Sequence, residues 1–135
     1  MILIIYTSQN DKLALVLQKN KHIFNKKIKI GFQESEKILS LINQILKENK
    51  TRLNNLKGIG VFKGPGPFTA LRVGVVVANT LAYALDIPIY GFKENDVKDL
   101  KKLSKKIEHN KNKELIKPFY GQLPSITKPK KAWLK

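Results

Sequence analysis

The chain has 135 residues, which suffices for one domain with a buried core but not for two full lobes around a cleft. The longest apolar stretch, residues 73–85, contains Asn79 and Thr80 and is too short to span a bilayer. The absence of cysteine excludes disulfides and thiolate metal sites. Residues 1–5 lack the basic lead-in and cleavage site of a signal peptide, so we expect a cytoplasmic protein.

The net charge of +16 favours non-specific attraction to phosphate polyanions such as nucleic acids. However, only Arg52 and Arg72 of the 26 basic residues are arginine, the residue that binds phosphate in bidentate fashion. The charge therefore fits either a nucleic-acid site or a generally basic, solvated surface.

Three strands are predicted at the start of the chain. The first is a continuous apolar run suited to a central strand, the second follows a polar turn, and the third alternates isoleucine with lysine as a half-buried strand does. These strands cover residues 2–6, 13–18 and 22–30. They should form an antiparallel meander.

Two helices and two further strands follow. Apolar residues at helical spacing predict a helix over 34–49, and a short apolar run predicts a strand over 59–62. A Gly/Pro-rich turn then leads into a second helix over 69–85, and residues 87–90 supply a fifth strand.

This order of elements predicts an α/β fold with a five-stranded mixed sheet. If the fourth strand lies beside the first and the fifth outside it, both crossovers run in the same direction. Right-handed connections then place both helices on one face of the sheet.

Beyond residue 92 the composition becomes rich in lysine, with 13 lysines and 5 acidic residues in the last 43 positions. Apolar residues at helical spacing between Val97 and Ile107 predict a short amphipathic helix. Residues 109–113 have the composition of a solvated break, and the proline-containing residues 118–135 are expected to form an extended basic tail.

A turn between the fourth strand and the second helix is the most specific segment of the sequence. Its residues are Lys63, Gly64, Pro65, Gly66, Pro67, Phe68 and Thr69, with Arg72 one turn into the helix. Backbone N–H groups at the start of a helix can bind an anion, although proline removes two of the donors. The alternative is a tight strand-to-helix corner that needs glycine for its backbone angles.

These residues, together with four other segments, resemble the TsaB family, also called YeaZ. The resemblance rests on residues 1–8, 35–39, 64–74 and 86–91, and the string Gly64-Pro65-Gly66-Pro67-Phe68-Thr69 is its most specific part. The tail around residues 117–127 is similar to the closing segment of the family. Between these regions most of the family's second lobe is missing.

The resemblance implies a single actin-like, ribonuclease-H-like lobe over residues 1–92, a lysine-rich helical remnant or linker over 93–117, and the tail over 118–135. It also implies a non-catalytic scaffold that needs no cofactor. This scaffold would bind and stabilise the TsaD-type transferase in tRNA threonylcarbamoyladenosine modification. Possible further partners are the TsaE-type ATPase, tRNA through the complex, and a second copy when TsaD is absent.

Four positions depart from the family pattern. Tyr6 stands where the family carries the aspartate that faces a nucleotide-bound metal in actin-like ATPases, and a phenol is a poor metal ligand. Glu34, Pro67 and Ala70 replace the usual histidine, serine and glycine. Each change weakens the interpretation of these positions as a ligand site.

Other candidate chemistry is sparse. His22 and His109 have no metal-ligand spacing and are expected to face solvent. Ser8, Ser35 and Ser40 have no paired base in the sequence, so we predict neither a nucleophile nor a metal site.

The second helix is apolar nearly all round, so we predict that a partner covers one of its faces. With the first helix it would present a two-helix surface that pairs with another into a four-helix bundle. The predicted partner-binding residues are Ile38, Leu41, Ile42, Ile45, Ala70, Leu71, Gly74, Val77, Ala78, Leu81 and Ala82. On this interpretation Gly74→Leu weakens association without unfolding the chain, whereas the alternative is that the first helix alone covers the excess.

Three functions remain open from the sequence. The favoured one is the scaffold that binds TsaD. The second is a stand-alone basic RNA-binding module, and the third is a residual actin-like nucleotide-binding enzyme, which the missing lobe and Tyr6 disfavour.

Overall fold

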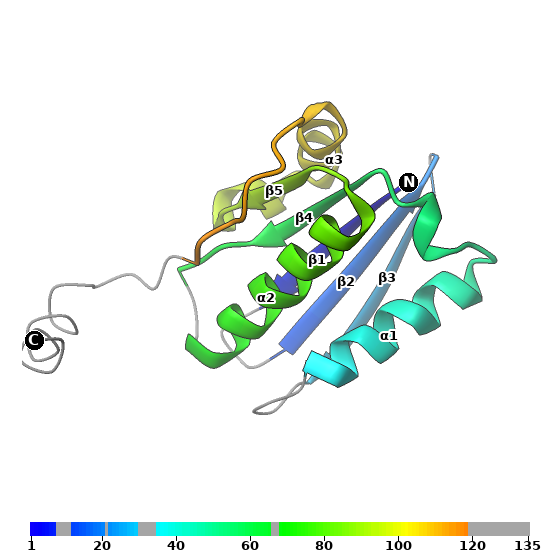
Figure 1. The fold of residues 1–135 in the computed structure, drawn as a ribbon, viewed down its shortest axis with the longest axis horizontal. Helices are drawn as coiled ribbons and strands as arrows, with labels where there is room; N and C mark the ends of the chain where they lie inside the picture. The colour runs from blue at the N-terminus through cyan, green and yellow to red at the C-terminus, as the bar shows by residue number, and fades with distance from the viewer. Residues whose placement is uncertain (8–11, 21, 30–34, 66–67, 119–135) are drawn as a thin grey trace, which may run out of the picture.

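The structure is a computed structural model that describes residues 1–7, 12–20, 22–29, 35–65 and 68–118. Within these ranges a five-stranded sheet is covered by helices on both faces (Figure 1). The strands are β1 (Ile2–Thr7), β2 (Lys12–Lys19), β3 (His22–Lys29), β4 (Gly58–Phe62) and β5 (Ile89–Phe92). The helices are α1 (Ser35–Glu48), α2 (Phe68–Leu85) and α3 (Leu100–His109), with 3-10 turns η1 (Leu53–Asn55) and η2 (Glu94–Lys98).

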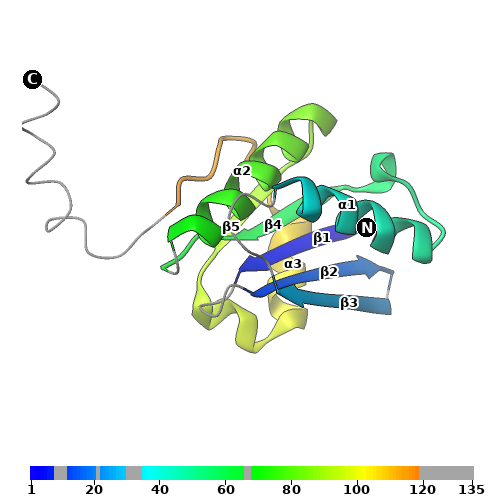
Figure 2. The same ribbon diagram turned by 90° about the horizontal axis from the view of Figure 1, so that it is seen from below.

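The sheet order β3-β2-β1-β4-β5 confirms the predicted topology. β1, β2 and β3 form an antiparallel meander, whereas β1, β4 and β5 are parallel. α1 and α2 both lie on one face of the sheet, as right-handed crossovers require (Figures 1 and 2). The predicted mixed α/β sheet with two helices on one face is therefore confirmed.

The fifth strand begins two residues later than predicted. The amide of Ile87 donates to the carbonyl of Ala82 at 3.0 Å, and Asp86 adopts a left-handed φ of 54°. Both features belong to the end of α2, where a left-handed residue lets the following amides satisfy the last helical carbonyls. Ile87 therefore belongs to the C-terminal cap of α2, and β-pairing starts after Pro88 at Ile89.

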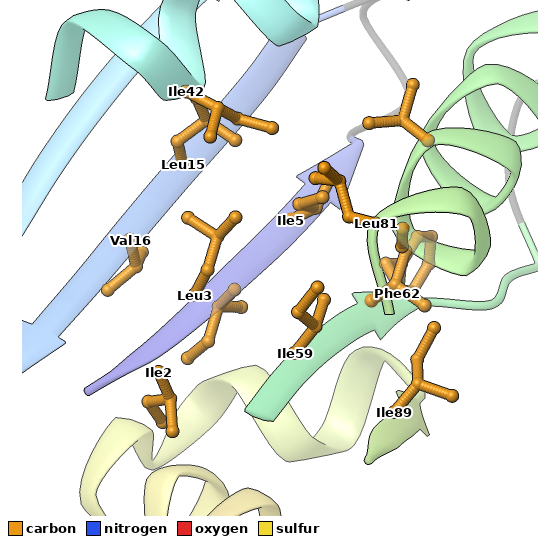
Figure 3. Close-up of a cluster of buried hydrophobic side chains, with 14 of the residues drawn as sticks. Ile2, Leu3, Ile5, Leu15, Val16, Ile42, Ile59, Phe62, Leu81 and Ile89 are labelled. Atoms are coloured by element: carbon orange, nitrogen blue, oxygen red, sulfur yellow. The ribbon is translucent and has the colours of Figure 1, made fainter. Parts of the chain in front are cut away.

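The main core lies between the sheet and the pair α1 and α2. Alternate residues of β1 and β2, including Leu3, Ile5 and Leu15, are buried under Ile42 of α1 and Leu81 of α2 (Figure 3). Burying such side chains stabilises the fold by about 1.5–3 kcal/mol each. The alternating apolar residues of the strands and the apolar stripe of α1, both visible in the sequence, form this core.

The short helix α3 covers the opposite face of the sheet (Figure 2). Its Leu103 and Ile107 are buried, and Ile107 packs over Gly58 and Gly60 of β4. A Cβ atom at Gly60 would lie 2.4 Å from Cδ1 of Ile107, so the absent side chain is what allows α3 to approach β4 closely. The predicted C-terminal helix is present, although Val97 lies in the preceding turn η2.

A segment after α3 returns along the edge of the sheet. The amide of Ile89 donates to the carbonyl of Asn112 at 2.8 Å, and the Nδ2 atoms of Asn110 and Asn112 donate to the carbonyl of Ile89. Asn79 of α2 exchanges two hydrogen bonds of 2.9 Å with the backbone of Ile116. Residues 110–116, predicted to begin as a solvated break, therefore form a strap that covers the β5 edge.

The predicted extended tail from residue 119 onward lies outside the described residues, as do Ser8, Glu34, Gly66 and Pro67. Within the described ranges, no helix combines the length and apolar character that crossing a bilayer requires.

Candidate functional site

The pair α1 and α2 carries the predicted partner-binding residues, and the structure places most of them in the core. Leu41 is half-buried, and the side chain of Ala70 lies outside the described residues. The buried members are Ile38, Ile42, Ile45, Leu71, Gly74, Val77, Ala78, Leu81 and Ala82. The chain's own sheet and helices already cover these side chains, so they present little surface to a partner in this structure.

Gly74 illustrates this difference. A Cβ atom at this position would lie 3.0 Å from Cγ2 of Thr7 and 3.7 Å from Cγ2 of Ile5, so Gly74 faces β1. Its role is to let α2 approach the sheet closely. The structure gives Gly74→Leu a different expected effect, a loss of stability, because the leucine would have to displace β1.

A different set of residues faces outward on the two helices. Tyr83 is 86% exposed, Val76 is 53% exposed and Leu39 is 45% exposed, and Thr80 lies between the first two on α2. The Thr80 hydroxyl donates to the Val76 carbonyl at 2.8 Å, so its polar group is satisfied within the helix. We call Leu39, Val76, Thr80 and Tyr83 the outer helix face.

The Gly/Pro turn is only partly described. Gly64 has a φ of 107°, a conformation that favours glycine, and the Lys63 amide donates to the Phe92 carbonyl at 3.0 Å. Pro65 and Arg72 are exposed, and the side chains of Phe68 and Thr69 lie outside the described residues. The described part has the features of a tight strand-to-helix corner.

Tyr6 stands where the resemblance implies an aspartate. Its hydroxyl donates to the Glu94 carboxylate, at 2.7 Å to Oε1 and 3.0 Å to Oε2. Burial, followed by the hydrogen bond to Glu94 and its charge, raises the pKa of Tyr6 from 10.0 to about 12. The phenol is therefore protonated over the physiological range and cannot act as an anionic ligand.

An aromatic cluster surrounds Tyr6. Its ring meets Phe62 edge-on, with centroids 5.0 Å apart, and lies 6.3 Å from Phe92. In the described part of the chain, no group of three or more His, Asp or Glu side chains could hold a metal ion. The surroundings of Tyr6 are those of a packed ring with a hydrogen-bonded hydroxyl.

Sequence reasoning missed Glu94 and Asn79, which make the long-range hydrogen bonds to Tyr6 and Ile116. Neither residue stands in a motif, so only the fold reveals their partners. The prediction that His22 and His109 face solvent is confirmed, and His22 stacks on Phe24 with ring centroids 6.3 Å apart.

Comparisons with known proteins give two related names. A family model described as "TsaD: tRNA N6-adenosine threonylcarbamoyltransferase" matches residues 32–97, just under half of the chain. The tRNA threonylcarbamoyladenosine biosynthesis protein TsaB of Buchnera aphidicola from Acyrthosiphon pisum is 32% identical over 88 residues. This match covers 65% of the chain and 40% of the relative.

The TsaB protein of Bacillus subtilis is 40% identical over 55 residues, which cover 41% of this chain and 24% of the relative. A solved structure, YeaZ from Pseudomonas aeruginosa, superposes with a TM-score of 0.63 at 23% identity, over 68% of this chain and 43% of that one. The superposition supports the actin-like fold. The matched part of the chain spans at most about two fifths of the length of these curated relatives.

Proposed function

We propose that this chain, a member of the TsaB family over the part that the curated relatives match, is a non-catalytic scaffold in tRNA threonylcarbamoyladenosine modification. In this role it binds and stabilises a TsaD-type transferase in the cytoplasm through the outer helix face. The observation that carries the proposal is the exposure of Tyr83, Val76 and Leu39 on two neighbouring helices.

Uncovered apolar area on α1 and α2 favours this surface. Five large hydrophobic side chains are exposed within the described residues, and three of them lie on α1 and α2. Exposed large apolar side chains that gather on one face mark interaction sites more often than isolated ones do. Full burial of each is worth about 1.5–3 kcal/mol, so two or three of them can anchor a partner.

The geometry suits a partner that also presents helices. α1 and α2 lie side by side on the same face of the sheet (Figures 1 and 2). A second helix pair packed on them forms a four-helix arrangement, which a TsaD-type subunit or a second copy of this chain could complete. Tyr6 supports the non-catalytic part of the proposal, because its protonated hydroxyl is engaged with Glu94.

The proposal is tested by co-purification with the TsaD-type subunit of the same organism. Val76→Glu and Tyr83→Ser should each weaken the complex, because they place a charge or a truncated side chain in the contact. Leu115→Glu is the matched control, since Leu115 is 64% exposed on the strap, away from the outer helix face. Equal retention of the wild type and both outer-face variants would refute the proposed surface.

A second candidate function is a stand-alone RNA-binding module. The net charge of +16 favours it, together with exposed lysines on α3 such as Lys101, Lys102 and Lys105. This function predicts affinity for tRNA in the absence of any protein partner, with a steep loss as salt rises. Titration of tRNA onto the purified chain at two salt concentrations distinguishes the two functions.

A further inference from the structure

The face of the sheet opposite α1 and α2 is only partly covered. Ile107 brings α3 close to β4 over Gly58 and Gly60, which places the helix above the middle of the sheet and the β4 side. Within the described residues α3 packs mainly on β1, β4 and β5, and beside the half formed by β2 and β3 it leaves open space. A hollow of about 470 Å³ lies there, lined by Ile4, Ala14, Val16, Val97 and Leu100 among others.

A second hollow of about 320 Å³ continues the first along the same strands. Val16 pairs with Asn25 in the first hollow, and Gln18 pairs with Ile23 in the second. Leu100 and Lys101 of α3 likewise line the two hollows in succession. We call the two hollows together the β2–β3 trough.

The trough has an apolar floor and a cationic rim. Ile4, Ala14 and Val16 form the floor of the first hollow, and Ile23, 39% exposed, lines the second. The rim carries Lys27, Lys101 and Lys105, for which no ion pair is found among the described residues. Its one acidic residue, Glu108, accepts a 3.4 Å hydrogen bond from Gln18.

The dimensions of the strip match one helix. Neighbouring strands lie about 4.8 Å apart, so two strands offer a width of about 10 Å, close to the diameter of an α-helix. β2 has eight residues, which extend over about 26 Å, the length of a helix of about 17 residues. Packing a helix there would give β2 and β3 the cover that α3 gives to β4.

Charge decides between the possible occupants. Residues 119–135 of this chain carry four lysines and no acidic residue, so the lysine rim repels them. A second copy with a net charge of +16 is repelled as well. We propose that the β2–β3 trough is a docking site for an amphipathic helix of a partner protein, with apolar residues along one side and acidic residues flanking them.

This site lies on the other face of the sheet from the outer helix face, so the inference does not depend on the proposed TsaD contact. A suitable probe is a fluorescent synthetic peptide of about 17 residues with leucine at helical spacing and glutamate on both flanks. The control peptide has lysine in place of every glutamate. Binding to the full chain is followed by fluorescence anisotropy, and co-purification with the TsaD-type subunit is measured in parallel.

Two variants of the trough have matched controls. Ala14→Asp puts a carboxylate on the floor, and its control is Ala84→Asp on an exposed position of α2. The double variant Lys101→Glu with Lys105→Glu reverses two rim charges. Its control, Lys111→Glu with Lys117→Glu, makes the same charge change on exposed residues of the strap region outside the trough.

The wild type should bind the acidic peptide at least about tenfold more tightly than the lysine peptide, and both trough variants should lose about tenfold. The controls should change peptide affinity by no more than about twofold, and TsaD binding should be unaffected in the two trough variants. Equal losses in trough and control variants would overturn the proposal, because they indicate general charge attraction. Loss of TsaD binding in the trough variants would also overturn it. So would tRNA binding that only the rim substitution weakens, or self-association of the chain that Ala14→Asp abolishes.

Discussion

Substitution of Gly74 tests directly which side of α2 faces the sheet. The structure leaves 3.0 Å between a Cβ atom at this position and Cγ2 of Thr7, so a leucine side chain must push α2 away from β1. Overpacking of this kind costs about 1–3 kcal/mol. Leucine in place of glycine also gains about 0.8 kcal/mol of helix propensity, which leaves a net destabilisation of up to about 2 kcal/mol.

The assay is thermal unfolding of the purified chain followed by circular dichroism. A loss of up to about 2 kcal/mol should lower Tm by up to about 8 °C in a domain of this size. Val76→Leu on the exposed side of the same helix is the control and should change Tm little. An unchanged Tm for Gly74→Leu together with lost association would show that Gly74 faces a partner, and would refute the assigned orientation of α2.

Three further predictions concern the opposite face, the strap and Tyr6. Ile107→Ala removes the side chain that seats α3 on Gly58 and Gly60 and should destabilise the chain by about 3 kcal/mol in urea unfolding; a change below about 1 kcal/mol would show that α3 contributes little. Asn79→Ala removes both hydrogen bonds to Ile116 and should accelerate hydrogen exchange of the Ile116 amide, whereas unchanged protection would place the anchor of the strap elsewhere. Because the pKa of Tyr6 is raised from 10.0 to about 12, the unfolded state loses this proton first as pH rises. Its contribution to stability is therefore complete below pH 10 and falls between pH 10 and about pH 12; Tyr6→Phe should remove that part of the dependence, and identical pH profiles for the two proteins would contradict the raised pKa.

The fold could be predicted largely from local patterns. The apolar run of β1 and the helical stripe of α1 each reflect burial against the rest of the core. For the assumed strand order, the handedness of crossover connections then placed both helices on one face, which needs no knowledge of side-chain contacts.

The surface of α2 could not be predicted in the same way. Its sequence is apolar nearly all round, so periodicity does not distinguish the stripe that faces the sheet from the one that faces solvent. Gly74 and Ala78 are among the predicted partner-binding residues, but the structure buries both, and Gly74 allows close contact with β1. Val76, which is exposed, has no feature in the sequence that separates it from the buried Val77.

Contacts made by the lysine-rich segment were also beyond sequence reasoning. The asparagines at positions 110 and 112 stand in a polar stretch typical of a solvated loop, yet their amides bind the β5 edge. The close packing that Gly60 allows likewise involves Ile107, which lies 47 positions further along the chain. Such pairs become visible only once α3 is placed on the sheet.

The central claim is that the outer helix face binds a TsaD-type subunit. Light scattering coupled to size-exclusion chromatography, applied to the chain co-expressed with that subunit, gives the mass of whatever assembly forms. We expect the mass of a heteromeric complex for the wild type and for Leu115→Glu. For the variant that combines Val76→Glu with Tyr83→Ser, we expect the masses of two separate proteins. A wild-type chain that elutes alone, as a monomer at high concentration and without the co-expressed subunit, would contradict the claim.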